Sequence, residues 1–312
     1  MMTIAVTGAA GYLGARLCEA LAARGDARVV GIDVVAPRLP VPGVRTLQLD
    51  LCDPRLPEFL KAEGVHAVVH LAAIFEPIRD RRRLLRANVE SARRLLAAAS
   101  LAGVEHLLVA SSTMAYGAHP DNPPRLSEES PLRGNRCFPH AADAVEVERF
   151  VAGFAPRNPG MRVAVIRPCV VLGPHATHFL ARMFQQPVLP LPAGADPAWQ
   201  FIHEDDFATA CRLILEGRRE GTWNLVGSGT LCLSECAARL GIRVARIPVS
   251  LLRPAWRLAL RLGIPFSEAP PAMLPFFRWP WIADGAKAER ELGFVPRHGS
   301  SDAFDAFLKS FT

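Results

Sequence analysis

Short apolar runs alternate with longer amphipathic segments through the first half of the chain. The apolar runs cover residues 3–6, 28–32, 44–49, 66–71, 105–110 and 162–167. Helical patterns separate several of them, at residues 12–23, about 80–102 and about 140–155. Apolar strands joined by helices are buried on both faces, so the pattern predicts an α/β fold with a doubly wound parallel (Rossmann) sheet.

The second half of the chain has a looser pattern, and prolines become dense at 187–197 and 265–280. This composition predicts a smaller, loop-rich region that covers the carboxyl edge of the sheet. The expected division is a dinucleotide-binding Rossmann domain at residues 1–167, to which residues 200–230 return. The smaller substrate-binding or lid region is then formed by residues 168–199 and 231–312.

Residues 251–262 predict an amphipathic helix in that smaller region. Arg253, Arg257 and Arg261 follow one another at intervals of four residues and so share a face. A helix of this kind suits a lid, a subunit contact or a membrane surface. The pattern favours a lid or a subunit contact over the membrane surface.

Composition narrows the range of functions. Half of the 312 residues are apolar and 21% are charged, which is ordinary for a globular protein. The net charge of +6 comes from dispersed arginines without an accompanying aromatic stripe, so no nucleic acid partner is expected. No segment is apolar for long enough to span a membrane. Seven scattered cysteines without a CxxC pair predict neither zinc nor disulfides, and they suit a cytoplasmic protein without a metal site.

A glycine-rich turn joins the first expected strand to the first helix. Gly8 permits the tight turn, Gly11 lets the backbone approach a pyrophosphate, and Gly14 allows the helix to pack closely on the strand. The free N–H groups at the start of the helix favour phosphate. Asp33 ends the second strand, where a carboxylate binds ribose hydroxyls and repels a 2′-phosphate. These residues predict NAD rather than NADP.

The ordered motifs resemble the extended short-chain dehydrogenases/reductases of the NAD-dependent epimerase/dehydratase family. The matching segments are Thr7–Gly14, Asp50-Leu51, His70–Ala73, Asn88, Ser111–Gly117, Arg167–Pro174, Phe201–Asp206, Trp223–Gly227 and Leu292–Pro296. The resemblance covers nearly the whole chain. It implies cofactor contacts from Gly8, Ala10, Gly11, Tyr12, Leu13, Gly14, Asp33, Asp50, Leu51, Leu71, Ala72, Ala73, Asn88, Ser111 and Pro168.

The catalytic pattern of that family is incomplete here. Its members use a tyrosine, which transfers a proton, and a lysine four residues later, which lowers the pKa of that tyrosine. With Glu146 taken as the family's helix glutamate, Phe138 and Ala142 stand at these two positions. With Glu148 instead, they are His140 and Ala144. Neither alignment contains the pair.

Two residues are left as catalytic candidates. Ser112 matches the serine that orients the reacting oxygen, and it also serves as a candidate substrate contact. His140 is a tentative general acid, because histidine titrates near neutral pH. The alternatives are that Ser112 only bonds to backbone and that His140 is a solvent-exposed residue at a helix start. Asp143 and Glu146 are interpreted as first-turn residues, Tyr116 as a packing residue and His70 as a residue that orients the cofactor loop.

The expected pocket differs from that of relatives that act on nucleotide sugars. Val170 and Trp199 replace an asparagine and an arginine that those relatives place near the sugar diphosphate, so a pyrophosphate would lose polar partners. Apolar side chains dominate instead: Phe179, Met183, Phe184, Trp199, Phe266, Met273, Phe276, Phe277, Trp279 and Trp281. They suit an apolar small molecule, unless part of the set packs the small region or a subunit contact.

Two functions therefore remain open from the sequence. The first is an NAD-binding, epimerase/dehydratase-like oxidoreductase with an atypical catalytic site, acting on a largely apolar small molecule. The alternative is a catalytically silent NAD-binding protein with a structural, sensing or partner-binding role. A homodimer is an expectation of the family resemblance alone.

Overall fold

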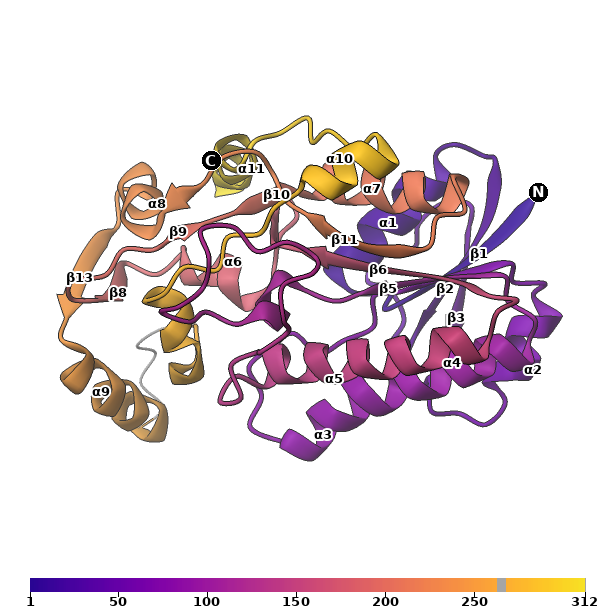
Figure 1. Cartoon of the computed structure of the whole chain (residues 1–312), viewed down its shortest axis with the longest axis horizontal. Coiled ribbons are helices and arrows are strands. Elements are labelled where there is room, and N and C mark those ends of the chain that lie inside the picture. Colours follow the sequence, from indigo (N-terminus) through magenta and orange to yellow (C-terminus); the bar gives the residue numbers. More distant parts are fainter. Residues whose placement is uncertain (263–267, 312) are drawn as a thin grey trace.

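A seven-stranded parallel sheet forms the centre of the chain in a computed structural model that describes residues 1–262 and 268–311 (Figure 1). Its strands lie in the order β11-β6-β5-β4-β1-β2-β3. Their bounds are β1 Met2–Thr7, β2 Ala27–Asp33, β3 Val44–Gln48, β4 Ala67–His70, β5 His106–Ala110, β6 Arg162–Pro168 and β11 Gly221–Leu225. The order reverses between β1 and β4, which is where doubly wound folds bind their ligands.

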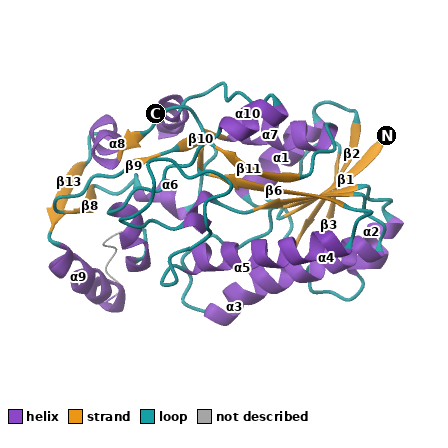
Figure 2. Ribbon diagram, in the orientation of Figure 1, coloured by secondary structure: helices purple, strands orange, loops and turns teal. Residues whose placement is uncertain are grey.

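Helices cover both faces of this sheet, and Figure 2 shows the resulting three layers. One face carries α1 (Tyr12–Ala22), α7 (Glu204–Glu216) and α10 (Ala286–Leu292). The other carries α2 (Leu56–Ala62), α3 (Arg81–Leu85), α4 (Ser91–Leu101) and α5 (Pro139–Phe154). The inner strands are largely buried, as in β6, of which only Arg162 is exposed, whereas the edge strand β3 has no buried residue. The doubly wound α/β fold is therefore confirmed.

The sequence patterns located six strands of the large sheet and the helices α1 and α5, but they did not predict α2, α7 or α10. All of the expected strands are present within two residues of their predicted limits, whereas β11 was not predicted as a strand. The helix expected at about 80–102 is interrupted, because a π-helical turn at Arg86–Glu90 separates α3 from α4. Such a turn inserts one extra residue and is frequent at functional sites.

A smaller group of elements lies beyond the carboxyl ends of the strands. It contains β7 (Val170–Leu172), α6 (Phe179–Met183), β8 (Val188–Pro192), β9 (Ala198–Trp199), β10 (Phe201–His203), β12 (Leu231–Cys232), α8 (Leu233–Leu240), β13 (Arg243–Ile247), α9 (Val249–Leu262) and α11 (Ser300–Leu308). The strands form three pairs, β7 with β10, β8 with β13, and β9 with β12. Short 3₁₀ turns lie at Thr113–Tyr116, Ala155–Arg157, Pro271–Phe277 and Lys309–Phe311.

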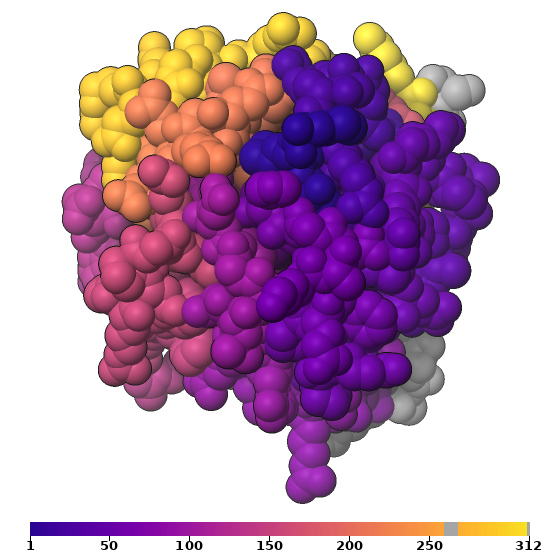
Figure 3. Space-filling view, turned by 90° about the vertical axis from the view of Figure 1, so that its right-hand side faces the viewer, coloured from indigo at the N-terminus to yellow at the C-terminus, as the bar shows by residue number. Residues whose placement is uncertain are grey.

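The C-terminal segments pack against the N-terminal ones. In Figure 3 the orange and yellow segments lie directly beside the indigo start of the chain, and α7 packs against α1. Residues after β10 return to the large sheet through α7 and β11. Among residues 1–262 and 268–311, no helix combines the length and the apolar character that a bilayer span requires.

Candidate active site

The glycine turn between β1 and α1 has the backbone geometry of a phosphate cradle. Gly8 has φ +74°, and a Cβ atom there would lie 2.8 Å from the Ala72 backbone. A Cβ at Gly14 would lie 2.0 Å from the carbonyl oxygen of Gly8. No side chain caps α1 at Gly11, and its first turn has no acidic residue. The N–H groups at this helix start are therefore available to an anionic group, as a dinucleotide pyrophosphate requires.

Two carboxylates flank the place where the adenosine half of a dinucleotide would lie. Asp33, half-buried at the end of β2, accepts hydrogen bonds from the N–H groups of Ala10 at 2.9 Å and Val35 at 3.2 Å. Asp50 accepts the N–H of Cys52 at 2.9 Å and pairs with Arg86 at 2.8 Å. These two partners lower the pKa of Asp50. Asp33 thus contacts the glycine turn directly, in a position to meet ribose hydroxyls.

The other predicted cofactor residues lie at the carboxyl edge of the sheet. Leu71 and Ala72 are half-buried and Ala73 is exposed in the loop after β4, while Leu51 and Pro168 are buried. Asn88, in the π-helical turn, holds that loop because its Oδ1 accepts the N–H of Ile74 at 2.8 Å. His70 lies 2.8 Å from the Thr7 hydroxyl, and burial lowers the pKa of His70 to about 4. It supports the turn as a neutral side chain.

A buried carboxylate, Glu204, connects this turn to the smaller region. It begins α7 and is 1% exposed. The Tyr12 hydroxyl donates to it at 2.5 Å, Arg16 lies 3.3 Å away, and the His175 N–H donates at 3.3 Å. Burial, followed by the charge of Glu204, raises the pKa of Tyr12. Tyr12 therefore stays protonated at neutral pH and contributes a structural hydrogen bond.

Ser111, Glu148, Arg167 and Tyr116 form a buried polar network behind the serine segment. Glu148 of α5 accepts from the Ser111 hydroxyl and from Arg167, whose Nη2 lies 2.7 Å away. Arg167 also donates to the Tyr116 hydroxyl at 2.8 Å, and that hydroxyl donates to Asn224 at 2.7 Å. Burial raises the pKa of Tyr116 to about 12. The interpretation of Tyr116 as a packing residue fits this position.

Glu146 lies on a different face of α5 from Glu148. It is half-buried and pairs with Arg93 of α4 at 2.7 Å. Neither Asp143 nor Glu146 is in the first turn of α5, which begins at Pro139, so that interpretation was wrong. Asp143 is buried instead, where it pairs with Arg81 at 2.8 Å and accepts from Asn88 at 3.1 Å. It stabilises the contact between α5 and the π-helical turn.

His140 lies in the first turn of α5, among aromatic rings. Its ring centroid is 5.0 Å from that of Phe75, 5.1 Å from Phe138 and 6.3 Å from Phe179. Burial lowers the pKa of His140 to about 4, and the Glu76 backbone hydrogen-bonds to the ring. The expectation of a solvent-exposed helix-start residue was therefore wrong. His140 is a neutral imidazole in an apolar environment.

Ser112 caps the short 3₁₀ turn at Thr113–Tyr116. Its Oγ accepts the N–H of Met114 at 3.1 Å and is half-buried. A hydroxyl that accepts a backbone N–H keeps its own proton for donation to a second partner. Ser112 can therefore orient a substrate oxygen without losing its structural hydrogen bond.

The predicted substrate contacts Val170 and Trp199 are buried and do not line an open pocket. Val170 is 5% exposed in β7, and Trp199 is completely buried and donates to the Phe276 carbonyl at 3.1 Å. Of the predicted apolar set, Phe266 lies outside the described residues and Trp279 is half-buried. The rest are buried: Phe179, Met183, Phe184, Met273, Phe276, Phe277 and Trp281. Much of the set therefore packs the smaller region, the alternative left open by the sequence.

Sequence reasoning missed Phe75, Glu204 and Arg81 as residues that shape this site. Phe75 lies in a loop and meets Phe179 of α6, already among the predicted apolar residues, only in the folded chain. Glu204 lies in a segment that matches the family, but the sequence does not show that its carboxylate is buried beside Tyr12. Nothing in the sequence indicates the ion pair of Arg81 with Asp143. Within the described part of the chain, no three His, Cys, Asp or Glu side chains are grouped as metal ligands would be.

Comparison with known proteins places this geometry in a family. Residues 4–225 match the family described as NAD dependent epimerase/dehydratase. An uncharacterized protein of Mycobacterium tuberculosis is 27% identical, over 98% of this chain and 83% of its own length. Sterol demethylase protein B of Methylococcus capsulatus is 34% identical, over 55% of this chain and 52% of its own.

Solved structures share the fold over the full chain. MoeE5 in complex with UDP-glucuronic acid and NAD superposes with a TM-score of 0.79 at 24% sequence identity, covering 99% of this chain and 98% of its own. NAD, the cofactor predicted from the glycine turn and Asp33, is the cofactor of the matched family. The match covers well over half of the sequence, and the chain belongs to the NAD-dependent epimerase/dehydratase family.

Proposed function

We propose that this protein is an NAD-dependent oxidoreductase of the epimerase/dehydratase type in which His140 stands at the position of the family's tyrosine. The observation that carries the proposal is the different setting of the two glutamates on α5. Of the two glutamates that can match the family's helix glutamate, only Glu148 bonds to the Arg167-Pro168 segment, which is itself one of the matching motifs. Glu148 bonds to Arg167 and is 6% exposed, whereas Glu146 pairs with Arg93 on the outside.

This alignment replaces the one that put Phe138 and Ala142 at the tyrosine and lysine positions. Counting back from Glu148 by the family's spacing gives Ala144 for the lysine and His140 for the tyrosine. Phe138 precedes α5 as its N-cap residue and is 1% exposed. It is therefore a packing residue against His140 and Phe276, with no part in proton transfer.

The residues of this chain then divide the chemistry between them. NAD, when bound, accepts or returns a hydride at the reacting carbon. Ser112 and His140 hold the oxygen on that carbon, and His140 takes or returns its proton through the ring nitrogen not bonded to Glu76. Because the Glu76 carbonyl accepts its N–H, the neutral ring presents an unprotonated nitrogen, which accepts the proton of a substrate hydroxyl during oxidation and, as the imidazolium, returns it during reduction. The missing lysine suits this arrangement, because a neutral imidazole already has an unprotonated nitrogen and needs no ammonium neighbour to lose a proton first, as a tyrosine does.

The substrate we propose is a largely apolar small molecule. Phe75, Phe138 and Phe179 surround His140 with apolar surface, and Val170 and Trp199 offer no donors to a diphosphate. One relative is named for a sterol, which agrees with such a site, whereas MoeE5 was solved with a nucleotide sugar. A hydroxyl or carbonyl group on an apolar skeleton is the expected substrate class.

A catalytically silent NAD-binding protein is the second candidate. Ala144 provides no cation at the lysine position, and the low pKa of His140 makes its imidazolium scarce at neutral pH. In this case the cofactor would serve a structural or sensing role. A dimer through α4 and α5 remains a prediction of the family resemblance under both candidates.

The test combines NAD binding with two engineered tyrosine–lysine pairs. The wild-type protein should bind NAD by calorimetry and should form NADH with a panel of apolar alcohols. His140→Phe should keep NAD binding but lose turnover by about 10²–10⁴-fold, the usual value of a positioned acid–base group. The double variant His140→Tyr with Ala144→Lys should be active, in contrast to His140→Phe.

The matched control is Phe138→Tyr with Ala142→Lys in the His140→Phe background, which should restore none. Turnover by His140→Phe at the wild-type rate would refute the role of His140. NAD binding without turnover of any panel member would favour the silent candidate. Failure to bind NAD would refute both.

A further inference from the structure

The helix α9 has an exposed apolar stripe on one face, as far as the described residues of the chain show. Leu251, Pro254, Ala255 and Leu258 are all exposed, and their spacing of three, four and seven residues puts them on one face. Leu251 is 61% exposed and Leu258 is 56% exposed. Exposure of two large aliphatic side chains to water on one helix face is energetically unfavourable, so this stripe is suited to a partner.

The opposite face of α9 already has its packing partner within the chain. Leu252 and Trp256 are buried, and the Trp256 ring lies 6.0 Å from that of Phe277. The helix is thus attached to the body of the protein through one face only. In Figure 1, α9 lies at the end of the molecule opposite to the N-terminus.

The charge of α9 has one sign. Its sequence contains arginines and no acidic residue. Arg253 and Arg257 are exposed and form no ion pair with any part of the chain that the structure describes. Measured round the helix at 100° per residue from the centre of the stripe, Arg257 lies at about 110° and Arg253 at about 150°, both on the same side. An apolar face with arginines on the polar side of the helix is the arrangement of helices that lie in a bilayer interface.

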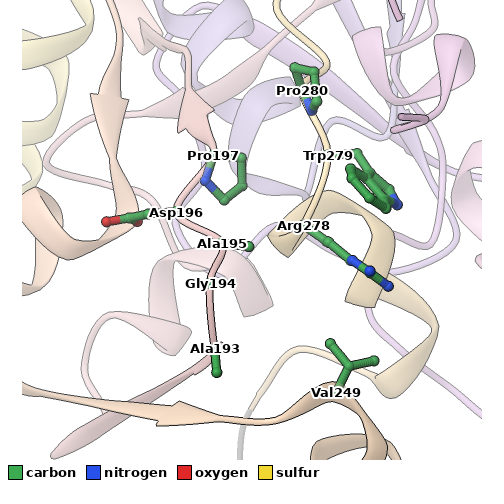
Figure 4. Close-up of a pocket in the computed structure, with 9 residues that line it drawn as sticks. All are labelled: Ala193, Gly194, Ala195, Asp196, Pro197, Val249, Arg278, Trp279 and Pro280. Atoms are coloured by element: carbon green, nitrogen blue, oxygen red, sulfur yellow. The ribbon is translucent and has the colours of Figure 1, made fainter. Parts of the chain in front are cut away.

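A further cation and an aromatic ring lie where α9 begins. Val249, Arg278 and Trp279 border a cavity of about 390 Å³, and Figure 4 shows their side chains around it. Arg278 is exposed and lies 4.5 Å from the centre of the Trp279 ring. Tryptophan and arginine are both favoured at the headgroup level of a membrane.

We propose that the outer face of α9, defined by Leu251, Pro254, Ala255 and Leu258 with Arg253 and Arg257, docks the protein onto anionic lipid bilayers. The apolar stripe enters the interface, and the arginines contact the lipid phosphates. A second copy of the chain is a poorer occupant, because a symmetric contact would place the arginines of the two copies close together. The proposal does not rest on the activity of the enzyme, since binding requires only the surface.

The experiment is co-sedimentation of the full chain with vesicles. Vesicles of phosphatidylcholine with phosphatidylglycerol should bind the wild-type protein, and phosphatidylcholine alone should bind it weakly. Arg253→Gln with Arg257→Gln should weaken binding to the anionic vesicles about thirtyfold, at about fivefold for each arginine near an anionic surface. Leu251→Glu with Leu258→Glu should weaken it tenfold or more.

Two control variants change the same residue types elsewhere on the surface. Leu101→Glu, at a leucine that is 76% exposed at the end of α4, should bind like the wild type. Arg149→Gln with Arg290→Gln, at exposed arginines of α5 and α10, should bind nearly like it as well. Circular dichroism of each variant checks that the fold is retained.

Three results would overturn the proposal. The first is absence of wild-type binding to anionic vesicles. The second is an equal loss of binding in the α9 variants and the control variants. The third is a concentration-dependent dimer in sedimentation velocity that Leu251→Glu abolishes, because that result would assign the stripe to a second copy.

Discussion

Removing the Glu148 carboxylate should destabilise the protein far more than removing Glu146 from the same helix. Glu148 is 6% exposed and Arg167 is 7% exposed, so both charges have lost most of their water. Arg167 donates to Glu148 through Nε at 3.0 Å and through Nη2 at 2.7 Å. The variant Glu148→Ala would leave the guanidinium of Arg167 buried with only the Tyr116 hydroxyl and the Glu128 carbonyl as partners.

The size of the effect follows from the burial of the pair. Loss of one partner from a buried ion pair costs about 3–5 kcal/mol, because the remaining charge is left uncompensated. The pair of Glu146 and Arg93 has side chains that are 45% and 47% exposed. Exposed pairs contribute at most about 1 kcal/mol. A difference of at least about 2 kcal/mol between Glu148→Ala and Glu146→Ala is therefore expected.

Urea denaturation followed by tryptophan fluorescence measures this difference as a shift in the midpoint. Glu148→Ala with Arg167→Met should recover part of the lost stability, because the double variant buries no unpaired charge. Equal midpoints for Glu148→Ala and Glu146→Ala would refute the reasoning. They would also remove the basis for aligning His140 with the family's tyrosine.

Three further predictions concern the cofactor and the buried histidines. Gly8→Ala should weaken NAD binding at least about tenfold in calorimetry. The new Cβ atom would lie 2.8 Å from the Ala72 backbone, and φ +74° disfavours alanine. An unchanged affinity for NAD would contradict the role of the turn. Asp33→Ser should reduce the preference for NAD over NADP by about tenfold or more, because the repulsion of the 2′-phosphate is lost. An unchanged ratio of the dissociation constants for NAD and NADP would contradict this role of Asp33. His70 and His140 have pKa values lowered from 6.5 to about 4 by burial, so the unfolded state binds more protons between these values and stability should fall as the pH falls. Each histidine should lower the free energy of unfolding by about 2 kcal/mol between neutral pH and pH 5. If the urea midpoint of His140→Phe declined as steeply with falling pH as that of the wild type, the lowered pKa of His140 would be contradicted.

The sheet was predictable because its signal is local. Most of the first six strands contain a run of apolar residues such as Ala67–His70, whereas β3 (Val44–Gln48) is a partly exposed edge strand with polar residues. The seventh strand, Gly221–Leu225, contains glycine, threonine and asparagine, and only its last three residues are buried. Its membership in the sheet depends on pairing with β6, a contact between distant segments that no periodicity reveals.

The cofactor half of the site was predictable for a similar reason, and the reacting half was not. The glycines of the turn and Asp33 act through backbone geometry that short motifs encode. The setting of His140 depends instead on Phe75, in the loop after β4, and Phe179, at the start of α6. Spacing alone also left two alignments of α5 open, since Glu146 and Glu148 differ only in the direction of their side chains.

The position of β11 affects how the chain can fold during synthesis. Strand β6 lies inside the finished sheet, between β5 and β11, and its residues after Arg162 are all buried. Until residue 225 has emerged from the ribosome, β6 is an open edge with unpaired backbone groups and an apolar face. Open apolar edges invite pairing with other chains. A truncated chain that ends before β11 is therefore expected to aggregate, and the nascent chain to depend on chaperones over this interval.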